Sequence, residues 1–306
     1  STIVAIKLGE KNYKDANLVL GNIILLNIIL SSLVSCIGLI WLEPILYAFG
    51  GSESTIKYAY EYMQILLIGN VLTHIYFGLN NMLRSIGHPK ISMIATIVSV
   101  AINVILDPIF IFVFDMGVSG AALATIISQA ISAVWVLAFL FGKKAIIPLE
   151  LKNMVLNRSI TKDIIRLGTS NFIMQGTNCV VQVVCNATLQ SYGGDLYVGI
   201  MTVINSVREI FSLPVRGIVT GAQPVISFNY GAKEYERAKS GIRFNTWMGA
   251  GYTLLAWLLV VIIPRFWLGI FSDNAQMIET GESVLRIYFF GFVFMALQFA
   301  GQSTFQ

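Results

Sequence analysis

Asp107 is the residue whose type and setting in this sequence best suit chemistry. It lies in the stretch Ile91 to Phe114, which contains no other Asp, Glu, Lys or Arg. A carboxylate inside an apolar helix usually marks an ion or proton path. Asn103 precedes it by four residues and therefore shares its helical face, where the amide could help to hold a cation or a proton. The open alternative is that Asp107 and Pro108 end the helix, with the carboxylate in water.

A second polar group interrupts the apolar stretch 196–230. Glu209 lies directly beside Arg208, and neighbours in a helix point away from each other. Arg216, seven residues after Glu209, and Asn205, four residues before it, lie on roughly the same face as Glu209. Buried charges in lipid need partners. A structural ion pair and a binding site for a cationic compound are both compatible with this pattern.

The surrounding elements follow from composition. Only 12% of the 306 residues are charged and 56% are hydrophobic, whereas soluble domains carry about 25% charged residues. Five stretches of at least 21 residues contain no Asp, Glu, Lys or Arg: 16–42, 62–83, 116–142, 167–194 and 244–264. Three weaker stretches complete the set: 91–114, 196–230 and 283–306. Since a membrane helix needs about 20 apolar residues and a barrel strand only about 10, we predict an all-α polytopic membrane protein with eight complete spans.

The basic residues predict how these spans are oriented. The segments between the spans alternate in their content of Lys and Arg. The basic set, with 15 Lys and Arg, comprises 7–15, 84–90, 143–166 and 231–243, and the alternating set carries only two. This asymmetry places the basic set in the cytoplasm of a protein of the cell membrane. The net charge of +4 therefore reflects topology, and no nucleic-acid partner is expected.

The sequence lacks the motifs of disulfide-rich, metal-binding, nucleotide-binding and hydrolytic proteins. The three cysteines, at 36, 179 and 185, fall within apolar stretches and indicate neither a disulfide framework nor a metal site. The sequence has no nucleotide-binding loop, nucleophile elbow or His-Glu-x-x-His pattern. We therefore expect neither an ATP-driven protein nor an enzyme.

An internal repeat organises the chain. Leu8 to Ala16 resembles Tyr230 to Ala238, with Gly, Lys, Tyr and Ala recurring at an offset of 222 residues. Six predicted spans separate the copies, so both enter the membrane in the same direction and form a parallel pseudo-two-fold repeat. The offset predicts two six-helix lobes, with about two helices missing here at each end. The predicted divisions are an N-terminal lobe at 1–142, a cytoplasmic linker at 143–166 and a C-terminal lobe at 167–306.

Several motifs together resemble the multidrug and toxic compound extrusion (MATE) family. They are Leu83 to Gly87 before Pro89, Asn103 to Pro108, Gly120 to Thr125, and Gln223-Pro224 followed by Asn229 to Gly231. The resemblance covers essentially the whole chain. It implies twelve helices in two six-helix lobes and a secondary active antiporter, which exports organic, often cationic, drugs or toxins in exchange for H⁺ or Na⁺.

The resemblance also carries site residues. In the family, the Asn and Asp that match Asn103 and Asp107 form a cation or proton site with the Thr that matches Thr125. An Asp of the family's first helix, which this chain lacks, also contributes. Because 167–194 and 283–306 contain no carboxylate, coupling is expected to depend on the N-terminal lobe. The expected partners are small organic substrates, the lipid bilayer and a transiently bound Na⁺ or H⁺, with no resident cofactor, in a monomer.

Two alternatives remain open. A lipid-linked oligosaccharide flippase of the same superfamily would need a more cationic cavity than the few arginines within spans supply. A passive channel would not accumulate substrate against a gradient. Methionine and aromatic side chains could line a cavity for apolar compounds, although packing is their usual role. These candidates are Met63, Met82, Met93, Met174, Met201, Phe172 and Tyr197.

Overall fold

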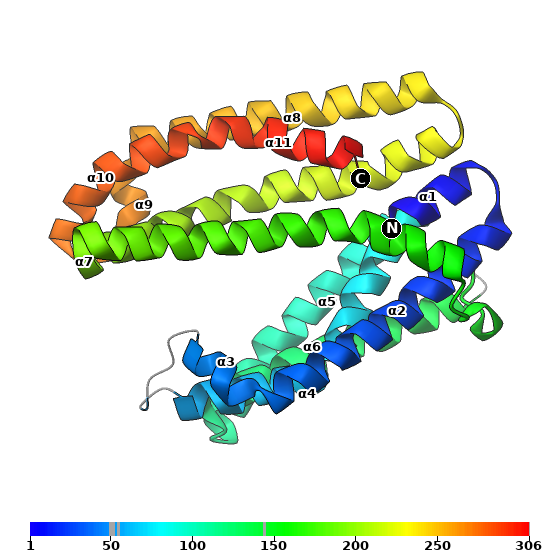
Figure 1. The fold of residues 1–306 in the computed structure, drawn as a ribbon, viewed down its shortest axis with the longest axis horizontal. Helices are drawn as coiled ribbons and strands as arrows, with labels where there is room; N and C mark the ends of the chain where they lie inside the picture. Colours follow the sequence, from blue (N-terminus) through cyan, green and yellow to red (C-terminus); the bar gives the residue numbers. More distant parts are fainter. Residues whose placement is uncertain (49–52, 54–55, 143–144, 306) are drawn as a thin grey trace. The chain divides into compact units, whose positions relative to one another are not determined.

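The computed structural model describes residues 1–48, 53, 56–142 and 145–305. Every regular element within these residues is helical (Figure 1). The chain divides into two compact units, Ser1–Ile164 and Ile165–Gln306. Each unit has its own apolar core.

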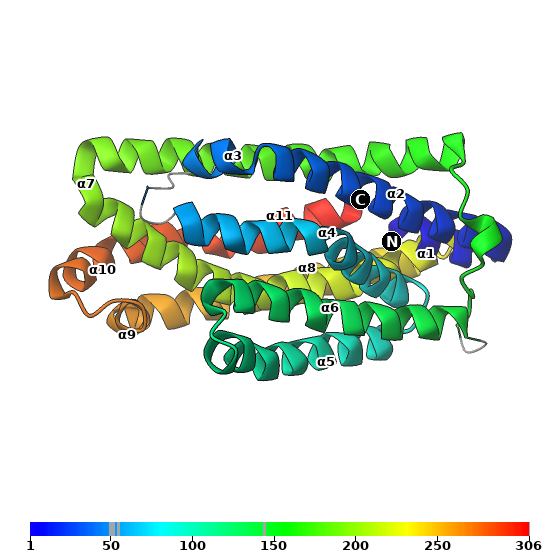
Figure 2. The ribbon, with the colours of Figure 1, turned by 90° about the horizontal axis from the view of Figure 1, so that it is seen from below.

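The first unit is built on four long helices. Its elements are α1 (Thr2–Gly9), α2 (Tyr13–Ile40), α3 (Leu42–Ala48), α4 (Ile56–Ser85), α5 (Pro89–Pro108), the π-helix η1 (Ile109–Val113), α6 (Gly117–Phe141) and the 3₁₀ turn η2 (Leu151–Asn153). Helix α6 packs against both α4 and α5, and α4 packs against α2. Helices α5 and α6 lie side by side in both views (Figures 1 and 2). This pair therefore brings residues of 89–108 and 117–141 together.

The segment predicted as a linker, 143–166, packs against α2. The fully buried Asn22 donates from Nδ2 to the carbonyl of Val155 at 2.7 Å and accepts at Oδ1 from the Asn157 amide at 2.8 Å. Asn17 donates to the carbonyl of Pro148 at 2.8 Å. Residues 143–144 lie outside the described residues, and the predicted divisions at 142 and 166 stay predictions.

The second unit begins within a helix that reverses direction. Helix α7 (Arg158–Gly231) is interrupted at Gly194, whose φ of 61° and ψ of −161° are not helical. We call 158–193 the first arm and 195–231 the second arm. Glycine suits this break because positive φ is costly for residues with a Cβ. The unit continues with α8 (Tyr235–Ile262), α9 (Pro264–Gly269), α10 (Ala275–Phe290) and α11 (Phe292–Phe305).

Seven helical segments among the described residues are long and apolar enough to cross a membrane. They are Tyr13–Ile40, Ile56–Ser85, Pro89–Val113, Gly117–Phe141, Leu196–Gly231, Tyr235–Ile262 and Ala275–Gln298. Each overlaps one predicted span. The eighth predicted span, 167–194, is helical up to residue 193 as part of the first arm, but it is not among the seven. Its row of Asn and Gln side chains makes it more polar than the absence of charges suggested.

The last span begins earlier than predicted, at Ala275 instead of residue 283. The predicted span, 283–306, begins directly after Glu282, and an unpaired carboxylate is costly in a membrane. In the structure, Glu282 accepts from Arg265 Nε and Arg286 Nη2, each at 2.8 Å. The Glu282 carboxylate in turn raises the pKa of Arg265, which lies in α9 outside the spans. This paired carboxylate is therefore compatible with an earlier helix start.

Candidate ion and substrate sites

The three residues predicted for the N-terminal lobe lie together in the first unit. Asn103 Nδ2 donates to Asp107 Oδ1 at 3.2 Å and approaches Thr125 Oγ1 at 3.4 Å. Asn103 and Asp107 come from α5, and Thr125 comes from α6. The Thr125 hydroxyl also donates to the carbonyl of Ala121 at 3.0 Å. We call Asn103, Asp107 and Thr125 the carboxylate cluster.

The helical path continues beyond Asp107. Helix α5 passes at Pro108 into the π-helix η1, which extends the candidate span to Val113. A proline in a helix removes a backbone donor, and π-helical turns are frequent at functional sites. Asp107 is half-buried. The α-helix thus ends at Pro108, but the candidate span continues through the π-helix to Val113, so Asp107 lies within the span.

Gly120 permits the close approach of α6 to η1. A Cβ at this position would lie 2.8 Å from the carbonyl carbon and 2.9 Å from the carbonyl oxygen of Phe110. Such separations are shorter than ordinary van der Waals contacts, so a larger residue would push the two segments apart. Because Thr125 follows Gly120 on α6 by five residues, this contact helps to hold Thr125 beside Asn103.

The carboxylate cluster offers oxygen ligands without a cationic partner. No described Lys, Arg or His side chain forms an ion pair with Asp107. The carboxylate, the Asn103 amide oxygen and the Thr125 hydroxyl are hard ligands of the kind that small cations prefer. The carboxylate can alternatively take a proton. The cluster can therefore change its charge by binding either ion.

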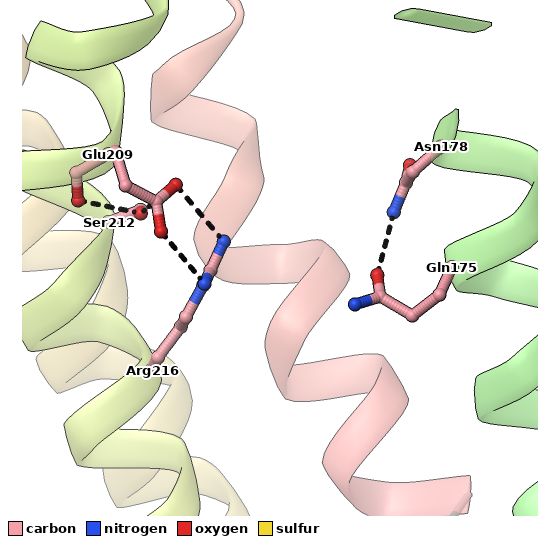
Figure 3. A network of polar contacts seen from close by, with 5 residues as sticks. All are labelled: Gln175, Asn178, Glu209, Ser212 and Arg216. Atoms are coloured by element: carbon pink, nitrogen blue, oxygen red, sulfur yellow. Dashed lines mark hydrogen bonds and ion pairs between the residues drawn. The ribbon is translucent and has the colours of Figure 1, made fainter. Parts of the chain in front are cut away.

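The second predicted group is arranged differently. Glu209 pairs with Arg216 at 3.0 Å (Oε1 to Nη1) and 3.4 Å (Oε2 to Nη2). The Ser212 hydroxyl donates to the Glu209 carbonyl at 2.9 Å and lies 3.5 Å from its Oε2. Figure 3 shows these three residues on the second arm. The Glu209 carboxylate is thus already engaged with a guanidinium.

Arg208 and Asn205 line a cavity of about 660 Å³ inside the second unit. Asn205 Oδ1 accepts from the Tyr288 hydroxyl at 3.3 Å, which leaves the Asn205 amide hydrogens free to donate. Arg208 is half-buried and has no hydrogen-bond or ion-pair partner among the described residues. Arg216 also lines the cavity, whereas Glu209 does not. Three of the four predicted residues therefore line the cavity, and Glu209 lies outside the lining, paired with Arg216.

The opposite wall of this cavity is a row of amides that the sequence interpretation missed. Five amide side chains of the first arm line it: Asn171, Gln175, Asn178, Gln182 and Asn186. Asn178 donates to Gln175 at 3.3 Å, and Figure 3 shows this pair on the first arm. Their separations of four, three, four and four residues place them on one helical face. That spacing was visible in the sequence, but a search for charged residues passes over it.

Two of the predicted apolar lining residues, Met174 and Met201, line the cavity, together with Met295 and Val181. Met82 is instead buried in the core of the first unit. No group of three or more His, Cys, Asp or Glu side chains that could hold a metal ion occurs within residues 1–48, 53, 56–142 and 145–305.

Comparison with known proteins supports the fold. The model of the MatE family matches residues 1–109 and 172–306. The chain is 26% identical over 287 residues to "Multidrug export protein MepA" of Staphylococcus aureus (strain MSSA476), covering 94% of this chain and 63% of the relative. It is 27% identical over 286 residues to the protein of the same name in Staphylococcus saprophyticus, with the same two coverages. The chain thus spans 63% of the length of these curated relatives.

Solved structures agree. "Outward-facing conformation of a multidrug resistance MATE family transporter of the MOP superfamily" matches with a TM-score of 0.94 and 22% identity, covering 100% of this chain and 68% of that one. "Crystal structure of MATE in the straight conformation" matches with a TM-score of 0.92 and 22% identity, covering 99% and 68%. These matches confirm the predicted all-α, two-lobe fold class, and with the apolar helices they identify a multi-pass protein of the cell membrane. The site residues stay predictions.

Proposed function

Because this chain belongs to the MatE family, we propose that it acts as a secondary active antiporter, which exports small organic compounds in exchange for H⁺ or Na⁺. The curated relatives are named multidrug export proteins, which supports drugs and similar compounds as the exported class. The relatives' names point to transport and not to an enzyme. We expect the protein to act as a monomer.

The observation that carries this proposal is the carboxylate cluster. Asp107 is a half-buried carboxylate in a candidate membrane span, and its hydrogen-bond partner, Asn103, is neutral. Burial of an unpaired carboxylate is unfavourable in its charged form. A bound proton or Na⁺ relieves this cost. The cluster is therefore suited to bind an ion reversibly, as coupling requires.

Coupling follows from a difference in exposure. A conformation that exposes Asp107 to water favours the empty, charged carboxylate, whereas one that encloses it favours the occupied, neutral site. Ion binding consequently shifts the equilibrium between the two conformations. If the organic compound binds the other conformation more tightly, its outward movement is driven by inward movement of the ion. Exchange requires only that the ion and the organic compound prefer different conformations of the protein.

The predicted orientation agrees with entry of the ion from outside. With the segments 7–15, 84–90, 143–166 and 231–243 in the cytoplasm, α5 enters the membrane from the cytoplasmic side. Asp107 then lies about sixteen residues along the helix path, or roughly 24 Å at 1.5 Å per residue. This depth is in the outer half of a membrane whose hydrocarbon core is about 30 Å thick. The carboxylate would thus be accessible from the side with the higher ion concentration.

The proposal is tested by transport in reconstituted vesicles. A Na⁺ gradient and a H⁺ gradient, each directed into the cytoplasmic side of the membrane, are imposed separately. Movement of a fluorescent organic cation is followed. We expect movement of the compound against its own gradient with at least one of the two ions. Equilibration without accumulation, whichever ion gradient is applied, would indicate a passive channel and contradict the antiporter.

A further inference from the structure

The described wall of the cavity in the second unit carries cationic side chains and no anionic ones. It is walled by the amide row of the first arm and by Asn205, Arg208 and Arg216 of the second arm. None of its sixteen described lining residues is Asp or Glu. The pocket therefore has two guanidinium groups on its wall and no lining carboxylate.

The two arginines are not equivalent. Arg216 is neutralised by Glu209 through two contacts, at 3.0 and 3.4 Å. Arg208 has no such partner in the described part of the chain. A guanidinium presents five hydrogen-bond donors in a planar fork, which matches the geometry of a carboxylate. Arg208 thus gives the cavity an uncompensated positive charge.

The amides add donors around this charge. Gln182 and Asn186 have no protein partner among the described residues, and the Asn205 amide hydrogens are free because its oxygen accepts from Tyr288. Amide groups on a membrane helix do not favour lipid, since unsatisfied polar groups in hydrocarbon are costly. Their common face suits a polar ligand or water. The methionines beside them offer an adaptable surface to an apolar ring system.

We propose that this cavity binds the carboxylate group of an organic anion or zwitterion, with Arg208 as the principal contact. A cationic compound is less well suited, because Glu209, the nearest acid in sequence, lies outside the lining and is occupied by Arg216. The proposal names a substrate class, and it rests on the proposed function, because a compound bound here is a substrate only if the protein is an exporter. Binding can nevertheless be measured without transport.

The test compares a xanthene dye that carries a free carboxyl group with the methyl ester of the same dye. The acid is zwitterionic and the ester is cationic, while the ring system is unchanged. Binding to the purified protein in phosphatidylcholine nanodiscs is measured by fluorescence polarisation with no ion gradient. We expect the acid to bind about tenfold more tightly than the ester, the range expected for a hydrogen bond to a charged group.

Substitutions assign this preference to one residue. Arg208→Gln should weaken binding of the acid about tenfold and change binding of the ester less than about twofold, and Arg208→Lys should restore part of the loss. Arg286→Gln is the matched control, because Arg286 carries the same charge in the same unit but pairs with Glu282 and does not line the cavity. It should leave both dyes unaffected.

A second variant keeps the proposal testable if Arg208→Gln fails to fold. Glu209→Gln releases Arg216 from its ion pair, so binding of the acid should become tighter. An ester that binds as tightly as the acid, or an Arg286→Gln variant that loses as much acid binding as Arg208→Gln, would overturn the proposal. So would displacement of the acid when phosphatidylglycerol replaces part of the phosphatidylcholine, since the site would then hold a lipid headgroup. Failure of transport with intact acid binding would contradict the export function alone.

Discussion

The carboxylate cluster of the first unit and the cavity of the second unit carry charges of opposite sign, and neither Asp107 nor Arg208 has an ion-pair partner among the described residues. Asp107 has only neutral partners around it, and its cluster is compact, with the Asn103 amide at 3.2 and 3.4 Å from the other two residues. Arg208 instead faces a cavity of about 660 Å³ in which several donors have no protein partner. A compact set of oxygens suits a small ion, and a wide wall of donors suits a larger molecule. Under the function proposed above, the first site would bind the ion and the second the organic compound.

The largest expected effect comes from removing the carboxylate of the cluster. Asp107→Asn keeps the size of the side chain but removes the charge that an ion neutralises. We expect affinity for the coupling ion to fall by about ten- to a hundredfold, in line with about 1.5–3 kcal/mol for a contact to a charged group. Transport driven by the ion gradient in vesicles measures this loss.

Glu209→Gln is the matched carboxylate substitution in the second unit. Since Glu209 pairs with Arg216, this variant should keep its dependence on the ion gradient. If Asp107→Asn retained wild-type efflux driven by the ion gradient, Asp107 would not take part in coupling. The proposed difference between the two units would then be wrong.

The next largest effect concerns the helix contact that supports the cluster. Gly120→Ala places a Cβ 2.8 Å from the Phe110 carbonyl carbon, so the free energy of unfolding should fall by about 1–3 kcal/mol. Gly251→Ala in α8 is the control in the second unit, where a Cβ meets nothing within 4 Å. It should be neutral or stabilising by up to about 1 kcal/mol. Thermal unfolding of the purified variants measures both; equal effects would mean that the α6 contact is not restrictive.

Removing the amide beside Asp107 should have a smaller effect. Asn103→Ala deletes the amide oxygen that would contact a bound Na⁺ in the proposed site, a contact worth about 1 kcal/mol, so Na⁺ affinity should fall about fivefold. Asn178→Ala, in the amide row of the second unit, should leave ion affinity unchanged. Titration of transport rate against ion concentration separates the two. A larger loss in Asn178→Ala than in Asn103→Ala would place the ion in the second unit.

The smallest effect is expected at Tyr288. Tyr288→Phe removes the hydroxyl that donates to Asn205, which frees the Asn205 amide to turn within the cavity. Binding of the carboxyl dye should change by no more than about threefold, because the lost contact is one neutral hydrogen bond within the protein, worth about 0.5 kcal/mol. Fluorescence polarisation measures this change, and a tenfold loss would make Tyr288 a principal contact in place of Arg208.

Much of the fold was accessible from sequence because lipid imposes strict rules. Uninterrupted apolar stretches and their flanking charges predicted helices that the structure contains, with boundaries displaced where charges are paired, as at Glu282. The absence of charged residues predicted an apolar span at 167–194, within the first arm. Its amides were overlooked, since Asn and Gln change hydropathy without changing net charge.

The sequence by itself determined which residues share a helical face. The four-residue spacing of Asn103 and Asp107, and the seven-residue spacing of Glu209 and Arg216, follow from the helical period alone, and both pairs interact. Only the tertiary structure decided which of these faces meet. It brought Thr125 of α6 beside Asn103, and it placed Arg208, which has no partner among the described residues, on the wall of a cavity opposite the amide row. Helical periodicity is local, whereas pairing and exposure depend on helices far apart in the chain.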